Sequence, residues 1–146
     1  MFSIKIDNNI IKEVTEIGIN LLFPHEKVNA DKKEILKANL KYKDDSVIIS
    51  SIIICSESKM IIDGHHRYFA LKELGLEKIP VTMINYFSDK IITDKNDSLM
   101  KHDIIENALS GKLYEPKSTK HLIFCEQKSD WFPITLISAL FNLKLN

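Results

Sequence analysis

Apolar residues recur along the chain with two different spacings, which predict a mixture of strands and helices. Residues 2–6 alternate apolar and polar side chains, which predicts a short strand, and the two asparagines that follow predict a turn. The next stretch, to Phe23, is ambiguous in its pattern. Residues 30–42 carry an apolar stripe beside a lysine-rich face, and Asn29 offers an N-cap, so we expect a helix there.

A second group of apolar segments forms the centre of the chain. Residues 47–55 are nearly continuous in apolar character and rich in β-branched side chains, which predicts one strand covered on both faces. After a polar break, residues 60–62 predict a second strand, residues 66–74 return to helical spacing before Gly75, and residues 79–84 predict a third strand. The predicted core unit is therefore helix, strand, strand, helix, strand.

The pattern changes beyond residue 88, where we expect a smaller element to begin. Residues 98–109 predict a helix, residues 116–121 a polar connection, and residues 134–143 a closing helix. We therefore expect a core over residues 1–88 and a C-terminal element over residues 89–146. The predicted fold class is α+β (α/β), a small mixed sheet with flanking helices and a short helical C-terminal element.

Composition narrows the class of protein without pointing to a function. A chain of 146 residues with 45% hydrophobic composition can bury one core. Lys and Arg total 20 and Asp and Glu total 20, so no net charge attracts nucleic acid or an anionic membrane. Cys55 and Cys125 stand in apolar surroundings and are expected to be buried thiols. No signal segment or membrane-length apolar run is evident, which favours a cytoplasmic location.

Five consecutive residues at a predicted strand-to-helix turn carry the clearest chemistry: Asp63, Gly64, His65, His66 and Arg67. Free N–H groups and the helix dipole favour an anion at such a turn, where Gly64 permits a tight path and Arg67 offers a donor fork for phosphate. Asp63 either caps the helix or holds a magnesium ion that bridges phosphates. The acid and the two histidines are too close together to supply a zinc ligand set, which argues against zinc.

Residues 61–70, with Leu74, Gly75 and residues 79–81 after them, resemble the ParB/sulfiredoxin-like fold. That resemblance covers roughly residues 16–87. Sulfiredoxins carry a catalytic cysteine beside their Gly-His-Arg stretch, whereas this chain has Gly64 and His65 there. This departure argues against a sulfinic-acid reductase.

Within that fold, three separated motifs resemble the free L-serine kinases. They are residues 23–26, the doubled histidine preceded by an acid, and residues 116–121, and together they extend the resemblance from about residue 16 to residue 124. It implies a kinase that converts free L-serine to O-phospho-L-serine, with ATP or ADP as donor and Mg²⁺ as cofactor. Ser118 stands where a threonine is expected, a mild departure because the hydroxyl is retained.

The same resemblance assigns roles to the motif residues. Glu26 is the expected general base, and Asp63 and His65 join it as catalytic residues. Asp63 is also the expected metal ligand. The nucleotide and its phosphates are expected at Asp63, Gly64, His65, His66 and Arg67, and the serine substrate at Lys117, Ser118, Thr119 and His121.

Two other functions remain open. Residues 64–70 also resemble the phosphate motif of ParB proteins, which would imply a CTP-binding DNA partition module. Residues 98–146 show no clear recognition helix and no basic cluster, so we expect neither nucleic acid nor membrane as a partner. A regulator that binds a ligand in the same pocket without turnover is the third possibility.

Overall fold

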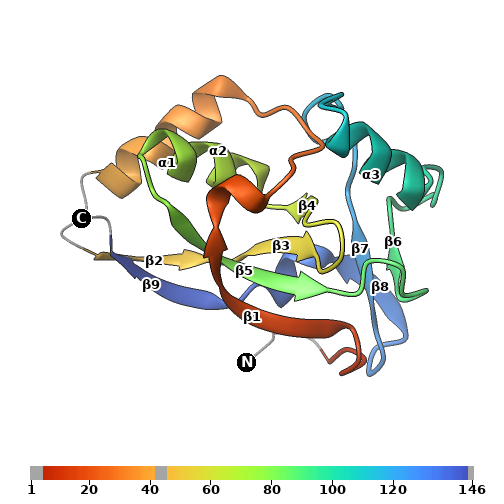
Figure 1. The fold of residues 1–146 in the computed structure, drawn as a ribbon. Helices are drawn as coiled ribbons and strands as arrows, with labels where there is room; N and C mark the ends of the chain where they lie inside the picture. Colours follow the sequence, from red (N-terminus) through yellow and green to blue (C-terminus); the bar gives the residue numbers. More distant parts are fainter. Residues whose placement is uncertain (1–4, 42–45, 145–146) are drawn as a thin grey trace.

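The computed structural model describes residues 5–41 and 46–144, and its largest sheet has four strands (Figure 1). The strands are β1 (Ile11–Gly18), β3 (Ile52–Cys55), β4 (Ile61–Asp63) and β5 (Lys78–Ile84). They lie in the order β1-β5-β3-β4, in which only the β3–β5 pair is parallel. The predicted mixed sheet and the strands over residues 60–62 and 79–84 are confirmed.

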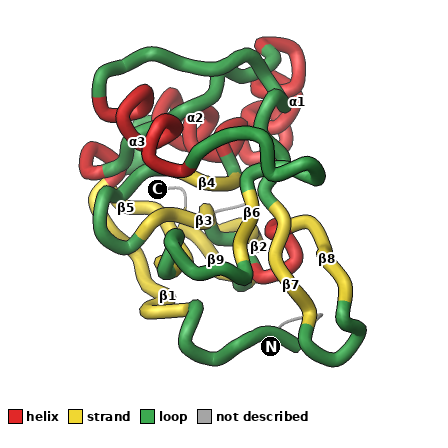
Figure 2. The backbone as a smooth tube through the Cα atoms, turned by 90° about the vertical axis from the view of Figure 1, so that its right-hand side faces the viewer, coloured by secondary structure: helices red, strands yellow, loops and turns green. Residues whose placement is uncertain are grey.

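Two helices lie side by side and a third stands apart from them (Figure 1), and all three are drawn above the strands in Figure 2. They are α1 (Ala30–Lys41), α2 (His65–Glu73) and α3 (Lys101–Leu109). The Asn29 side chain caps α1 as predicted, because its oxygen accepts a hydrogen bond from the Lys32 N–H at 3.0 Å. Gly75 has a φ of 84°, which suits the left-handed turn that ends α2.

The apolar stripe predicted on α1 was wrong in part. Leu40 is buried, but Ile35 has 63% of its surface exposed. Two lysines face α2 instead: the Lys33 and Lys37 ammonium groups lie 2.6 and 3.2 Å from carboxylate oxygens of Glu73. The helices therefore meet through an ionic layer that apolar periodicity does not report. The last residue of the predicted helix, at position 42, lies outside the described residues.

The strand predicted over residues 47–55 is divided into β2 (Ser46–Ser50) and β3. At the division, the Ser51 N–H donates to the Ala139 carbonyl at 2.7 Å, and its hydroxyl lies 2.7 Å from the Thr82 hydroxyl. The chain changes partners here, from β9 (Leu140–Lys144) to β5. The prediction of one strand covered on both faces holds for β3 but is wrong for β2, where Ile48 is exposed.

The helix predicted over residues 134–143 was wrong. A short 3-10 helix (Ile134–Ile137) is followed by β9, which pairs antiparallel with β2. Pairing with a partner distant in sequence has overridden the local helical spacing. The rest of this region is β6 (Ile91–Ile92), β7 (Leu122–Cys125) and β8 (Asp130–Pro133), a three-stranded sheet beside α3. The helix predicted over residues 98–109 is confirmed as α3, which begins at Lys101.

The N-terminal segment differs from its predicted pattern. Residues 2–4 of the predicted strand lie outside the described residues, and Lys5 and Ile6 are not in a strand. The predicted turn is confirmed, since the Asp7 carboxylate accepts a hydrogen bond from the Asn9 N–H at 2.9 Å. The ambiguous stretch after it contains β1 and a 3-10 helix (Ile19–Leu21).

The four-stranded sheet separates two clusters of buried side chains. Ile53 of β3 packs with Ile104 of α3 and Ile123 of β7, whereas Ile54 packs with Leu71 of α2. Both cysteines are buried free thiols, as predicted. No helix in the described part of the chain is long and apolar enough to cross a membrane. Because the first cluster joins both parts of the chain, the elements after residue 88 are held firmly against the sheet.

Candidate active site

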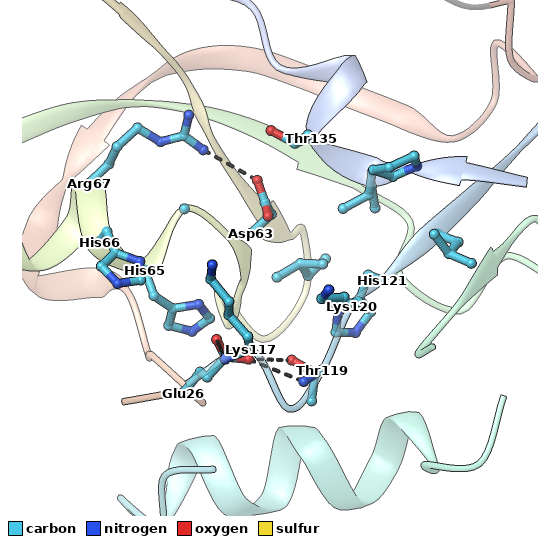
Figure 3. Close-up of a pocket in the computed structure, with 15 residues that line it drawn as sticks. Glu26, Asp63, His65, His66, Arg67, Lys117, Thr119, Lys120, His121 and Thr135 are labelled. Atoms are coloured by element: carbon cyan, nitrogen blue, oxygen red, sulfur yellow. Dashed lines mark hydrogen bonds and ion pairs between the residues drawn. The ribbon is translucent and has the colours of Figure 1, made fainter. Parts of the chain in front are cut away.

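A pocket of about 510 Å³ lies where four separate segments of the chain meet (Figure 3). Its wall contains all but one of the residues expected at the site. These are Glu26, Asp63, Gly64, His65, His66, Arg67, Lys117, Thr119 and His121. The exception is Ser118, an exposed residue whose hydroxyl donates to the Glu115 carbonyl at 2.6 Å. Residues that are 90 or more positions apart are thus brought together in one cavity of ligand size.

The turn between β4 and α2 is built around Gly64, which is the N-cap of α2 and has a φ of 106°. No side chain caps this helix, so the capping role considered for Asp63 was wrong. The Asp63 carboxylate instead lies 3.3 Å from the Arg67 guanidinium and accepts a hydrogen bond from Thr135. The first N–H groups of α2 are therefore left available beside the pocket.

Asp63 and Arg67 form a largely buried pair in which burial and charge act in opposite directions. Burial raises the pKa of Asp63, and the positive charge of Arg67 opposes that rise. Burial likewise lowers the pKa of Arg67, against the effect of Asp63. The Arg67 Nε is buried with no hydrogen-bond partner in the described structure. This unused donor is available to a ligand in the pocket.

The two neighbouring histidines are held as hydrogen-bonded neutral rings. His65 Nε2 accepts the His25 N–H at 3.0 Å, and His66 Nε2 accepts the Asn29 N–H at 3.1 Å. Each ring therefore carries its hydrogen on Nδ1. Burial holds the pKa of His65 well below its usual value and also lowers the pKa of His66. Both rings can offer a hydrogen bond to phosphate, while positive charge must come from other residues.

Glu26 lies in an extended segment, residues 23–27, which runs between β4 and residue 114. Isolated bridges join Phe23 to Met60 and Glu26 to Tyr114. The Glu26 side chain is 7% exposed, and its carboxylate receives three hydrogen bonds. Oε1 accepts the Lys117 N–H at 2.7 Å, and Oε2 accepts the Thr119 N–H at 3.3 Å and its hydroxyl at 2.8 Å. A carboxylate has about four acceptor positions, so Oε1 retains one for a ligand.

No protein-family model matches the chain. A ParB-like protein from Sulfolobus acidocaldarius is 32% identical over 115 residues, which cover 72% of this chain and 55% of that protein. An ATP-dependent L-serine kinase from Staphylothermus marinus is 31% identical over 80 residues, covering 51% of this chain and 31% of the kinase. The matched part is thus about half of the first relative and about a third of the second.

Solved structures decide the fold. A free serine kinase in complex with AMP superimposes with a TM-score of 0.69, covering 99% of this chain and 95% of that chain at 14% identity. The chain has the fold of the free serine kinases. The resemblance found in the three sequence motifs is confirmed at this level, and the departures of β2 and β9 from their predicted states do not alter it.

In this serine-kinase fold, sequence patterns gave no role to two residues that line the pocket and to one that lies behind its wall. Thr135 and Lys120 line the pocket, but sequence reasoning gave neither a role. His25 belongs to a motif but had no assigned role either. It is fully buried, with Nδ1 2.6 Å from the Ile61 carbonyl oxygen and Nε2 2.7 Å from the Thr119 hydroxyl. Its position between a proline and the expected base was the one available signal.

His121 reaches the pocket from the other side. Its Nε2 lies 2.8 Å from the Tyr86 hydroxyl, and its Nδ1 is buried with no hydrogen-bond partner in the described structure. Burial lowers the pKa of His121 to about 3, so the ring is neutral at physiological pH. An unpartnered ring nitrogen at a pocket wall is a natural contact for a polar ligand.

The buried neutral histidines predict acid-sensitive stability. His65 and His121 have lowered pKa values in the folded protein, and both regain an ordinary pKa near 6.5 on unfolding. The unfolded state therefore binds more protons in acid. The contribution of these two histidines to the free energy of unfolding is fully present above about pH 6.5 and is lost as the pH falls below it. Each proton contributes a slope of about 1.4 kcal/mol per pH unit. Urea unfolding between about pH 7.5 and 4.5 would measure this slope.

A matched pair of variants separates this effect from general acid sensitivity. His121→Gln should reduce the slope of the unfolding free energy against pH by up to about 1.4 kcal/mol per pH unit, the contribution of one proton. Replacement of an exposed histidine, His102→Gln, should leave this slope unchanged. Equal slopes in the two variants would show that the buried His121 ring is not a source of the acid sensitivity.

Proposed function

We propose that this protein is a kinase that phosphorylates the hydroxyl of free L-serine to O-phospho-L-serine, with ATP or ADP as donor. One observation supports this most directly: the Glu26 carboxylate and the Gly64 turn of α2 line the same pocket. A proton acceptor and an anion cradle facing one cavity are the minimum equipment for phosphoryl transfer to an alcohol. The names of the L-serine kinase relatives and the serine-kinase fold agree with this proposal.

Glu26 is the proposed general base. The serine hydroxyl would donate to the open acceptor position of Oε1 and lose its proton to that oxygen as it attacks the terminal phosphorus. The new P–O bond forms while the bond to the bridging oxygen breaks, and the shortened nucleotide leaves with the electron pair. Hydrogen bonds from the Lys117 and Thr119 N–H groups fix the orientation of the carboxylate during this step.

The β4–α2 turn is the proposed phosphate cradle. The free N–H groups at the start of α2, the Nδ1 hydrogens of His65 and His66, and the Arg67 Nε supply donors. No group of three or more metal-ligating side chains occurs among the described residues. A single carboxylate, that of Asp63, is compatible with Mg²⁺, because this ion is commonly held by one or two carboxylates together with phosphates. The ion would neutralise phosphate charge.

The segment after α3 is the proposed substrate wall, so that residues 89–146 complete the site begun by residues 1–88. Lys117 and the unpartnered Nδ1 of His121 are the candidates for the amino acid's polar groups. Thr119 would act on the substrate through Glu26, because both its N–H and its hydroxyl are bonded to that carboxylate. Ser118 lies outside the pocket wall, so its substrate role would require it to move.

The proposal is tested by incubating the protein with L-serine, Mg²⁺ and ATP, ADP or CTP in turn, and measuring O-phosphoserine by mass spectrometry. We expect phosphoserine with ATP or ADP, and its loss when EDTA removes the metal. L-threonine and L-alanine serve as acceptor controls that differ by one methyl group or lack the hydroxyl. Failure to form phosphoserine with any donor would refute the kinase activity.

A ParB-like nucleotide-binding module without kinase activity is a second candidate, because the match that covers 72% of this chain is to a protein named ParB-like. This alternative predicts that CTP binds more tightly than ATP or ADP and that no phosphoserine forms. It also predicts DNA binding that weakens steeply with salt. The donor series above, with a DNA titration at two salt concentrations, distinguishes the two candidates.

A further inference from the structure

Three buried side chains, one of which is the proposed base, make more hydrogen-bond contacts than their ordinary protonation states can supply. His25 Nδ1 lies 2.6 Å from the Ile61 carbonyl oxygen, and His25 Nε2 lies 2.7 Å from the Thr119 hydroxyl oxygen. The same hydroxyl oxygen lies 2.8 Å from Glu26 Oε2. His25, Thr119 and Glu26 are buried, with exposed fractions of 0%, 8% and 7%. Each contact must therefore contain a hydrogen from one of its two partners.

With a neutral His25 and an ionised Glu26, these contacts hold one hydrogen too few. A carbonyl oxygen only accepts, so His25 Nδ1 must carry a hydrogen. If the ring is neutral, Nε2 can only accept, and an ionised Glu26 can also only accept. The Thr119 hydroxyl then has one hydrogen to donate and two acceptors to satisfy. One of the two short contacts would hold no hydrogen at all, which is unfavourable in a buried site.

We infer that His25, Thr119 and Glu26 form a proton relay that holds one proton more than a neutral imidazole and a carboxylate. The proton has two placements. On His25, it makes an imidazolium that donates to Thr119, which donates to an ionised Glu26. On Glu26, it makes a carboxylic acid that donates to Thr119, which donates to a neutral His25. Moving between them transfers one proton at each end of the hydroxyl and changes no other bond.

The aromatic rings around His25 bring no charge of their own to it. The His25 ring is packed edge-on against His65 of α2 at 4.5 Å, against His121 at 5.7 Å and against Tyr114 at 6.1 Å between ring centres. Burial lowers the pKa of His25, and the charge of Glu26 partly opposes this. Burial thus disfavours the placement of the proton on His25 in the resting protein. The two histidine neighbours are themselves neutral, because burial lowers the pKa of each.

This inference rests on the proposed function for its catalytic meaning. Glu26 is a base only in the arrangement that has the proton on His25, and it then takes the serine proton at Oε1 as the P–O bond forms. The relay of His25, Thr119 and Glu26 then holds two protons more than a neutral imidazole and a carboxylate. One of them returns to water through the pocket when the product leaves. His25 is in this sense a positioning residue, which acts on the substrate only through Thr119 and Glu26.

The proton count can be measured in the resting protein without any turnover. We would record ¹⁵N shifts of the His25 ring and the ¹³C shift of the Glu26 carboxyl group at neutral pH in labelled protein. Two protonated ring nitrogens with an ionised Glu26, or one protonated nitrogen with a protonated Glu26, would each support the relay. A single ring hydrogen together with an ionised Glu26 would overturn it. If no phosphoserine forms, the proposed function fails while this measurement still stands.

Variants of the linking hydroxyl test the coupling. Thr119→Ser keeps the hydroxyl, so the pH dependence of kcat should remain that of the wild type. Thr119→Val removes it, so kcat should fall about tenfold or more and its pH profile should shift, because no hydroxyl then joins Glu26 to His25. Equal pH profiles for the two variants would overturn the relay. The ring and carboxyl shifts of Thr119→Val should also titrate independently, a readout that does not depend on activity.

Discussion

Replacing Glu26 with glutamine is expected to abolish phosphoserine formation while nucleotide binding persists. The change removes the proposed base but leaves the β4–α2 turn, where the phosphates would bind, intact. General base catalysis contributes on the order of 100- to 10,000-fold, so the loss of kcat should fall in this range. Mass spectrometry measures the product, and calorimetric titration with ADP measures the binding.

The matched control is Glu115→Gln, which removes an acid that lies outside the pocket. Glu115 has a 75% exposed side chain that pairs with the exposed Lys27, so kcat should be unchanged. Thermal unfolding of both variants is needed, because the amide introduced by Glu26→Gln cannot accept all three hydrogen bonds that the carboxylate receives. A folded Glu26→Gln protein with normal turnover would remove Glu26 from the mechanism.

Replacing Gly64 with alanine is expected to weaken both stability and nucleotide binding. At a φ of 106°, a side chain is strained, and an added Cβ would lie 2.7 Å from Arg67 Nη2 and 3.2 Å from Ile52 Cγ1. The backbone strain alone costs on the order of 1–3 kcal/mol. Displacing the Arg67 guanidinium should also lower nucleotide affinity about tenfold, the worth of one charge-assisted hydrogen bond. Urea unfolding and ADP titration measure the two effects.

Gly75→Ala separates backbone strain from contact. Gly75 also has a positive φ, 84°, but nothing in the described structure lies within 4 Å of an added Cβ. This variant should therefore lose stability from strain alone and bind nucleotide normally. If Gly64→Ala binds nucleotide as tightly as Gly75→Ala does, the turn is not the phosphate cradle.

Sequence patterns predicted the region around the motif well because its signals are local. The strands at residues 60–62 and 79–84, the helix between them and its Gly75 terminus all follow from apolar spacing and a single glycine. The Asn29 cap was predictable for the same reason, since a capping side chain acts within one helical turn. In each case the residues that decide the structure lie next to one another in the chain.

Elements whose state depends on a distant partner were not predictable. β9 has apolar residues that fit a helix, yet it is a strand because β2 offers it a ladder of hydrogen bonds. The division at Ser51 depends on contacts with Ala139 and Thr82, neither of which lies near it in sequence. Ion pairing between α1 and α2 is likewise a property of two helices together.

The pocket likewise contains residues that the sequence predicted and residues that it did not. The resemblance to serine kinases placed Glu26, the β4–α2 turn and Lys117 in one site, and the structure brings them to one cavity. Thr135 and the contacts of His25 were missed, because a threonine or histidine gives no sign in sequence of what it will face when buried. Short polar contacts over long sequence separations are the features that only coordinates reveal.

The extended segment over residues 23–27 has a consequence for the order in which the protein folds. Its backbone bonds on one side to Lys59 and Ile61 and on the other to Tyr114, so Glu26 is fixed in place only after both neighbours are present. Closing such long loops is entropically costly and slow compared with forming α1 or α2. A chain emerging from the ribosome would thus complete its helices and the β3–β4 hairpin well before the pocket proposed to bind nucleotide is complete. Binding of the proposed nucleotide should accordingly report the last stage of folding. When refolding is monitored by the binding of a fluorescent ADP analogue, the signal should appear later than the helical signal measured by circular dichroism.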